Sequence, residues 1–208
     1  GGGIAGLAAA WRLRKAGVED ILLMDLESEV GGTSRGGPSP WGAHYLPLPG
    51  RKAKAVRLLL EEMGVIQGWT QAGEPVYDET ALCAAPQERL YLHGRWQEGL
   101  FPALGASTED LRQRDAFRSG MAAFREGGDF SIPLDLSRPD PGLDRISMEA
   151  WLASKGFDSP RLRWWVDYAC RDDFGCSLKD VSAWAAVHYF VSREDSEVLV
   201  WPEGNARL

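Results

Sequence analysis

The sequence is poor in cysteine and in long apolar runs. Its 3 Cys in 208 residues are Cys83, Cys170 and Cys176, too few and too irregularly spaced for a disulfide scaffold or a zinc site. No apolar run approaches the roughly 20 residues that a membrane-spanning helix needs. We therefore expect three buried thiols, no metal site and no membrane span.

A surplus of basic residues is also missing. The chain has 23 Lys and Arg against 30 Asp and Glu, which gives a formal net charge of −7. A nucleic-acid-binding protein needs a basic face that neutralises phosphates. The sequence therefore predicts no nucleic-acid partner.

Glycine, in contrast, is abundant. The chain has 24 Gly, well above the usual ~7%, so many backbone positions are expected to need positive φ or close approach. The hydrophobic fraction of 44% is ordinary for a globular protein. The length fits one or two domains with a sizeable core.

The first elements read as a turn, a helix and a strand. Apolar residues recur at helical spacing in segment 4–11, which predicts a helix that ends near Lys15, before Gly17. The unbroken apolar run 21–24 predicts a strand buried on both faces of a parallel sheet, and Asp25 ends it.

Further elements follow from apolar periodicity, capping residues and turn residues. Helices are expected at 52–63, from Ser107 to Gly127, at 148–155, around 162–169, and after a cap formed by Ser177 and Asp180; a hairpin is expected at 88–97 with its turn at His93 and Gly94, and a short strand at 198–201. Segment 171–176 is expected to be a polar connection between helices. Its paired acids are either solvated or able to bind a cationic substrate or a metal.

The residues with chemical meaning lie at the N-terminus. The first six, Gly1-Gly2-Gly3-Ile4-Ala5-Gly6, satisfy G-x-G-x-x-G at the start of a helix. Gly1 permits the tight turn, Gly3 lets the backbone approach a pyrophosphate, and Gly6 lets the helix pack closely, while the helix N-terminus attracts the anion. Asp25 follows 19 residues after Gly6, close to the spacing of the carboxylate that binds an adenosine ribose. The flanking residues Ile4, Ala5 and Leu26 are also candidates for cofactor binding.

Asp25 is followed six residues later by the glycine pair Gly31-Gly32. A Rossmann start followed by acid-x5-Gly-Gly resembles the FAD-binding N-terminus of the flavin-containing amine oxidase superfamily, which includes monoamine and L-amino-acid oxidases, protoporphyrinogen oxidase and phytoene-desaturase-like enzymes. The resemblance implies that FAD is the cofactor and that the glycine pair closes a loop over its diphosphate. In that family a basic residue near the pair assists, and Arg35 is the nearest candidate here.

The resemblance also suggests residues beside the flavin ring. Segment 41–47 stands where such enzymes place a loop of small and aromatic residues. Gly42, Ala43 and His44 are therefore candidates to line the flavin, and His44 and Tyr45 are the candidate catalytic residues. A histidine bonded to backbone carbonyls is the commoner alternative for His44.

The implied fold class is α/β, with a Rossmann-like FAD-binding domain of the glutathione-reductase type lacking its first strand, plus an α+β substrate or cap region. Residues 1–65 would be the N-terminal part of the FAD-binding domain, 66–200 the substrate or cap region, and 201–208 the start of the return to the FAD-binding domain. Segment 202–208 resembles the Pro-x-Gly-Gly turn that makes this return. We expect the sequence to be part of a longer chain that is inactive in isolation, because no strand precedes Gly1.

The implied function is an FAD-dependent oxidoreductase that removes a hydride from a C–H bond of a small-molecule substrate, by amine oxidation or desaturation, onto flavin N5. Two alternatives remain open. One is a flavin reductase linked to NAD(P)H, which would need a second nucleotide motif, and the other is a non-catalytic binding protein of the same fold, similar to Rab GDP-dissociation inhibitors. The sequence does not fix the compartment: a reducing cytoplasm is the default, with export of a folded flavoprotein as the other option.

Overall fold

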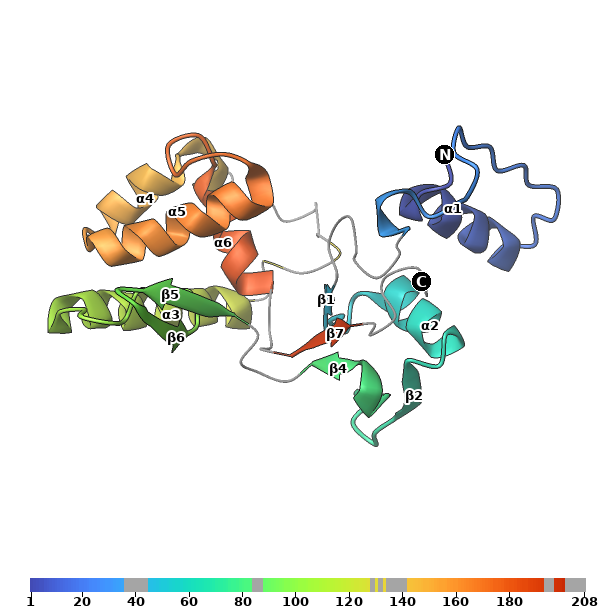
Figure 1. The fold of residues 1–208 in the computed structure, drawn as a ribbon, viewed down its shortest axis with the longest axis horizontal. Coiled ribbons are helices and arrows are strands. Elements are labelled where there is room, and N and C mark those ends of the chain that lie inside the picture. The colour runs from blue at the N-terminus through green and yellow to red at the C-terminus, as the bar shows by residue number, and fades with distance from the viewer. Residues whose placement is uncertain are drawn as a thin grey trace.

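The chain forms three regions, shown in Figure 1. In this computed structural model the described residues are 1–35, 45–83, 88–127, 130, 133, 142–192 and 197–200. We call residues 1–35 the N-terminal region, residues 45–83 with 197–200 the sheet region, and the described residues of 88–192 the helical region. The sheet region lies between the other two (Figure 1).

The N-terminal region contains one α-helix, α1 (Ile4–Lys15), and a short 3₁₀ helix, Gly32–Ser34. Gly17 takes a φ of +85° just beyond α1, so the predicted helix and its glycine stop are confirmed. No residue of α1 is buried. The apolar stripe of this helix therefore packs against little of the described chain.

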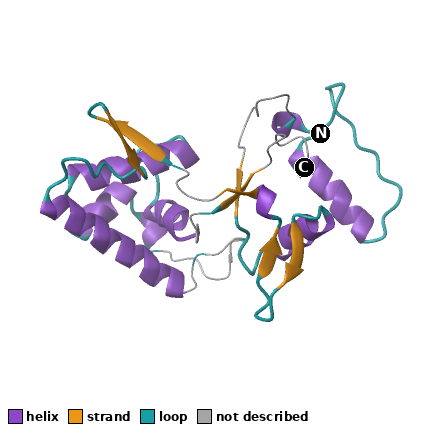
Figure 2. Cartoon of the chain, turned by 60° about the horizontal axis from the view of Figure 1, so that its bottom comes forward, coloured by secondary structure: helices purple, strands orange, loops and turns teal. Residues whose placement is uncertain are grey.

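Segment 21–24 is not a strand, so the prediction of a doubly buried strand is wrong. Leu22 is 80% exposed and Met24 is 71% exposed, whereas Ile21 and Leu23 are half-buried. This alternation is typical of a strand with one covered face, but a strand also needs a hydrogen-bonded neighbour. No described residue pairs with this segment, and Figure 2 colours the chain between α1 and the following 3₁₀ helix as a loop.

The sheet region is built on a three-stranded antiparallel sheet in the order β1-β7-β4. Its elements are β1 (Tyr45–Pro47), α2 (Lys54–Glu62), β2 (Ile66–Trp69), β3 (Pro75–Tyr77), a 3₁₀ helix (Glu79–Ala81), β4 (Leu82–Cys83) and β7 (Val198–Val200). Helix α2 and strand β7 confirm the elements expected at 52–63 and 198–201, with slightly shorter bounds.

One face of this sheet is covered and forms a small core. Leu199 in β7 is fully buried, and Leu46 and Leu82 pack around it together with Leu60 of α2. The cluster combines residues before and after position 65, where we placed a domain boundary. The domain limits stay a prediction.

The helical region has the larger core. Its elements are β5 (Arg89–Leu92), β6 (Arg95–Glu98), α3 (Thr108–Gly127), a 3₁₀ helix (Leu143–Arg145), α4 (Met148–Ser154), α5 (Pro160–Phe174) and α6 (Ala183–Ser192). Phe117, Leu152, Leu162, Val166 and Val187 are completely buried in one cluster. This region therefore contains enough apolar packing to hold its helices together.

Turn and cap residues explain most boundaries in the helical region. His93 and Gly94 both have positive φ, 51° and 75°, as the two-residue hairpin turn requires. The Ser147 side chain accepts a hydrogen bond from the Ala150 N–H, and the Ser107 hydroxyl oxygen accepts one from the Asp110 N–H. The hairpin and these two helix starts are therefore confirmed.

Two local predictions in this region are wrong. Ser177 and Asp180 close a turn instead of capping a helix; helix α6 starts at Ala183, and the Ser182 hydroxyl accepts from the Ala185 N–H in its first turn. Segment 171–176 is not a connection either, because α5 continues to Phe174 and Gly175 ends it in the left-handed conformation.

The three cysteines differ in exposure. Cys170 is buried, Cys83 is half-buried and Cys176 is exposed, and none of the three forms a disulfide within the described residues. The prediction of three buried thiols is therefore right only for Cys170. Within the described part of the chain, no helix has both the length and the apolar character needed to cross a bilayer.

Candidate functional site

Asp25 lies beside the glycine turn that precedes α1. Its Oδ2 accepts a hydrogen bond from the Gly2 N–H, and its Oδ1 accepts one from the Glu27 N–H at 2.9 Å. The acid and the turn are 23 residues apart in sequence, so this contact fixes the path of the chain between them. The carboxylate is held at the mouth of the turn.

The pKa of Asp25 lies below the ordinary value of 3.8 because the Glu27 and Gly2 N–H groups donate to its charged form. Each carboxylate oxygen has two lone pairs and uses one on these backbone bonds. The ionised Asp25 can therefore accept additional hydroxyl donors from a ligand at neutral pH.

The glycine pair folds back onto the same turn. The Gly31 N–H donates to the Gly2 carbonyl oxygen at 2.7 Å. Gly31 and Gly32 have φ of +122° and +54°, a region that glycine enters without strain. A Cβ on Gly32 would lie 3.0 Å from the Gly3 Cα, so the close approach of the two backbones also requires glycine.

Gly6 is the tightest position of the motif. A Cβ on this residue would overlap with the Gly1 carbonyl oxygen, and it would also lie 3.3 Å from Cδ1 of Leu23. The absence of a side chain thus allows the glycine turn and segment 21–24 to pack against the first turn of α1. Gly1 itself has room, since its nearest neighbour would be the Asp25 carboxylate at 3.6 Å.

The N-terminus of α1 supplies hydrogen-bond donors. Its N-cap residue, Gly3, has no side chain to bond the first amides, and the first turn contains no acidic residue. The leading N–H groups of a helix lack intrahelical acceptors and carry the positive end of its dipole. Because no side chain of this glycine turn competes for these N–H groups, the donor set could hold a diphosphate group.

The remaining candidates of the N-terminal region lie around this turn. Ile4 is 55% exposed and Leu26 is fully exposed, so both side chains are accessible. Arg35 donates a backbone bond to Gly32 O at 3.2 Å. Its guanidinium lies 3.4 Å from the Glu27 carboxylate, so it faces the loop and not the glycine turn.

The candidates for the flavin side are only partly described. Gly42, Ala43 and His44 lie outside the described residues. Tyr45 begins β1 and is 40% exposed, on the face of the sheet opposite to Leu46, which packs into the core. In α5, partial burial raises the pKa of Tyr168, and the negative charges of Asp172, Glu88 and Tyr45 raise it further.

A polar contact joins α1 to the sheet region. The Glu62 carboxylate at the end of α2 accepts a hydrogen bond from the Trp11 indole N–H at 2.9 Å and pairs with the Lys15 amine at 2.5 Å. These two hydrogen bonds also lower the pKa of Glu62. One carboxylate thus holds two residues on successive turns of α1.

Sequence reasoning missed two of these participants. Gly2 occupies a variable position of G-x-G-x-x-G, yet its N–H and its carbonyl oxygen join the motif to Asp25 and to Gly31. Its place between two motif glycines was the available signal. Glu62 gave no signal, since its contacts with α1 span 47 and 51 residues.

The glycine turn, the helix N-terminus and the carboxylate together define a Rossmann-like dinucleotide-binding motif. The model of the NAD(P)-binding Rossmann-like domain family matches residues 1–62, which include α1, Asp25, the glycine pair and α2. The comparisons with curated proteins and with solved structures gave no match. The first 62 residues are thus a Rossmann-like dinucleotide-binding segment.

Proposed function

We propose that the protein is an FAD-dependent oxidoreductase whose N-terminal region binds the adenosine diphosphate half of the flavin. The observation that carries the proposal is the convergence of three separate motifs on Gly2: the Asp25 carboxylate on its N–H, the Gly31 N–H on its carbonyl oxygen, and α1 beginning two residues later. A dinucleotide needs these features together, namely a ribose acceptor, an open backbone and phosphate donors.

Each group has a separate role in binding. The ionised Asp25 would accept hydrogen bonds from the ribose hydroxyls. The first amides of α1 would donate to the diphosphate, and Gly3 and Gly32 would let it approach the backbone. An acid at position 25 also disfavours a 2′-phosphate on that ribose, which argues against NADP.

The choice of FAD over NAD rests on the glycine pair. Gly31 and Gly32 bring a second stretch of backbone against the first turn, with a Cβ-free approach at Gly3. This arrangement supports the resemblance to the flavin-containing amine oxidase superfamily and its glutathione-reductase-type FAD fold. When bound, the flavin would accept the hydride at N5.

The substrate would lie on the side of Tyr45. Tyr45 lies on the exposed face of the sheet and is 40% exposed, so its ring would be available to contact an apolar substrate. Amine oxidation and desaturation both remain open as reactions, and so does the catalytic role of His44 and Tyr45.

The proposal is tested by purifying the full-length protein and recording its visible absorption spectrum. We expect bound flavin at one equivalent per chain, released as FAD on denaturation. Asp25→Ala should lower FAD affinity by about tenfold or more, because it removes a charged hydrogen-bond acceptor. Asp20→Ala is the matched control, since Asp20 is exposed in the same loop.

Two results would reject this function in favour of its alternatives. A colourless protein that binds NADH but not FAD would make it a nicotinamide-dependent protein, as the description of the matched family allows. A colourless protein that binds neither dinucleotide would favour the non-catalytic binding protein. FAD binding with equal affinity in the wild type and Asp25→Ala would reject the assigned ribose acceptor.

A further inference from the structure

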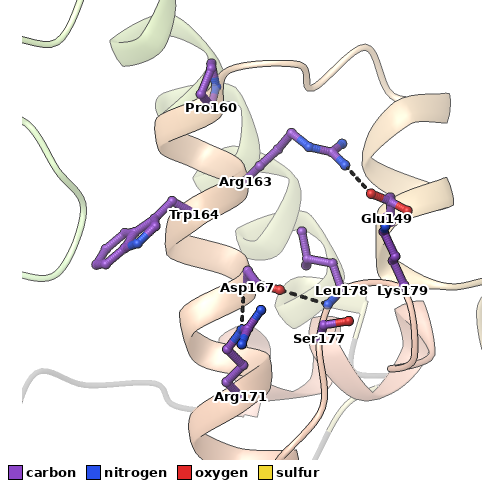
Figure 3. A pocket seen from close by; sticks show the side chains of 9 residues that line it. All are labelled: Glu149, Pro160, Arg163, Trp164, Asp167, Arg171, Ser177, Leu178 and Lys179. Atoms are coloured by element: carbon purple, nitrogen blue, oxygen red, sulfur yellow. Dashed lines mark hydrogen bonds and ion pairs between the residues drawn. The ribbon is translucent and has the colours of Figure 1, made fainter.

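An open surface cavity of about 400 Å³ lies in the helical region, away from the glycine turn. It opens between α5, the start of α4 and the turn that precedes α6, as Figure 3 shows. Its volume falls in the range of small-molecule sites, about 300–1,000 Å³. Neither the dinucleotide motif nor the Tyr45 face uses it.

The cavity is lined by more cationic than anionic side chains. Arg163, Arg171 and Lys179 contribute three positive charges, and Glu149 and Asp167 contribute two negative charges. The two carboxylates are already engaged by protein donors. Glu149 accepts from the Arg163 guanidinium at 2.8 Å, and Asp167 accepts from the Leu178 N–H at 2.9 Å and from Arg171 Nε at 2.6 Å.

The cations, in contrast, keep donors to spare. Arg171 bonds through Nε alone, so its two terminal nitrogens have no acceptor among the described residues. Lys179 is exposed and forms no ion pair within the described part of the chain. A guanidinium with free N–H groups and an ammonium are the donors that bind carboxylate and phosphate groups.

The Asp167 carboxylate fixes this arrangement. It holds Arg171 from one oxygen and the backbone of Leu178 from the other (Figure 3). Leu178 is 6% exposed and anchors the turn in the core, so the neighbouring Lys179 starts from a fixed backbone. Arg171 makes an i,i+4 ion pair with Asp167 while its side chain stays 65% exposed, so its guanidinium is accessible to a ligand.

We propose that this cavity binds a small organic oxyanion, with Arg171 and Lys179 as the principal donors and Arg163 as an additional one. The added negative charge compensates the surplus positive charge of the lining. The volume exceeds what one inorganic ion requires, since a water molecule takes about 30 Å³ in the liquid, so the ligand carries a body of several more atoms. Leu178 and the aliphatic stems of the arginines contact that body.

The test is calorimetric titration of the protein with citrate, a tricarboxylate, and separately with inorganic phosphate, at constant ionic strength. We expect a citrate Kd on the order of 1 mM or tighter. Lys179→Glu and Arg171→Gln should each weaken binding by about tenfold, because each removes a charge-assisted bond. Lys155→Glu is the matched control: Lys155 is an exposed lysine at the end of α4, outside the lining, and its variant should bind citrate like the wild type.

The outcomes separate the ligand sources. Binding of citrate but not phosphate identifies a carboxylate site, and tighter binding of phosphate identifies a site for phosphorylated molecules. The proposal is overturned if neither anion gives a binding signal. It is also overturned if Lys179→Glu and Arg171→Gln unfold at the same temperature as the wild type and still bind citrate with unchanged affinity. Asp25→Ala should bind citrate like the wild type. The citrate titration therefore tests this cavity independently of the flavin assignment.

Discussion

The N-terminal region and the helical region hold their shapes in different ways. In the helical region, Phe117 and Leu162 are completely buried in a core shared by four helices. In the N-terminal region no residue of α1 is buried, while Leu22, Met24 and Leu26 are mostly or fully exposed. The conformation of this region therefore depends on backbone contacts at glycines and on one carboxylate.

This difference separates folding from binding along the chain. A core of packed apolar side chains tolerates changes at its surface but loses stability when a large side chain is removed. A turn made of glycines has few packed side chains to lose, but at Gly6 it has no space for a Cβ. Substitutions in the core of the helical region should therefore mainly lower stability. Substitutions in the glycine turn should mainly lower cofactor affinity.

The largest effect is expected from Phe117→Ala. The Phe117 ring is fully buried and contacts Trp151, Phe157, Trp165 and Phe190 edge to face. Its removal should lower the free energy of unfolding by about 3–5 kcal/mol, measured by urea denaturation followed by tryptophan fluorescence. Leu22→Ala is the control and should change stability by no more than about 0.5 kcal/mol. Equal losses in the two variants would erase the contrast between the regions.

Gly6→Ala should lower FAD affinity, whereas Phe117→Ala lowers stability. The new methyl group would overlap with the Gly1 carbonyl oxygen, so the glycine turn must open. We expect FAD affinity to fall by about 100-fold, or roughly 2.7 kcal/mol, in a flavin titration. Gly120→Ala has space around its Cβ inside α3 and should bind FAD normally. Unchanged affinity in Gly6→Ala would mean that the close approach at this position is not needed.

The pH dependence of FAD binding sharpens the role of Asp25. The Glu27 and Gly2 N–H groups lower the pKa of Asp25 in the folded protein. The contribution of its carboxylate to FAD binding is therefore complete above the ordinary pKa of 3.8. It disappears as the pH falls through the lower folded pKa. We expect affinity to be constant from pH 7 to about 5 and to decline only in more acidic solution. Asp25→Asn should bind about tenfold more weakly at neutral pH and lose this acid dependence. A wild type whose affinity falls between pH 7 and 5 would contradict the assignment.

The smallest effect is expected at a helix cap in the helical region. The Ser147 hydroxyl accepts the Ala150 N–H at 3.2 Å, and Ser147→Ala should cost about 1 kcal/mol of stability without changing FAD affinity. Ser119→Ala, at an exposed position inside α3, should instead be neutral or slightly stabilising because alanine favours the helix interior. Equal destabilisation by both would show that the cap contributes nothing.

Local signals predicted much of the helical region. The cap residue Ser147 and the turn pair His93-Gly94 determine the structure of only the few residues next to them. Their effects can therefore be predicted from the sequence. The start of α6 was missed because two capping candidates lie close together: the turn at Ser177 and Asp180 precedes the cap at Ser182 by five residues. Sequence patterns do not show which of two nearby serines begins a turn and which begins a helix.

Features that depend on residues far apart in the sequence were harder to predict. The apolar run 21–24 has the composition of a strand, but strand formation depends on a neighbour that the run itself does not specify. At the candidate site, the spacing of Gly6 and Asp25 correctly indicated that acid and turn lie together. The contacts of Glu62 with Trp11 and Lys15 could not be predicted, because nothing local links these positions.

The contact at Glu62 has a mechanical consequence. A helix held at two points one turn apart can neither roll about its axis nor tilt freely, so the direction of α1 is set at its C-terminal half, where Trp11 and Lys15 meet α2. The amides at its other end lie roughly 15 Å away at 1.5 Å per residue. A small change in the angle of α1 at Glu62 therefore becomes a larger displacement of the amides at its N-terminus. Glu62 thus influences the direction of these N–H groups, although it does not contact the group that they bind.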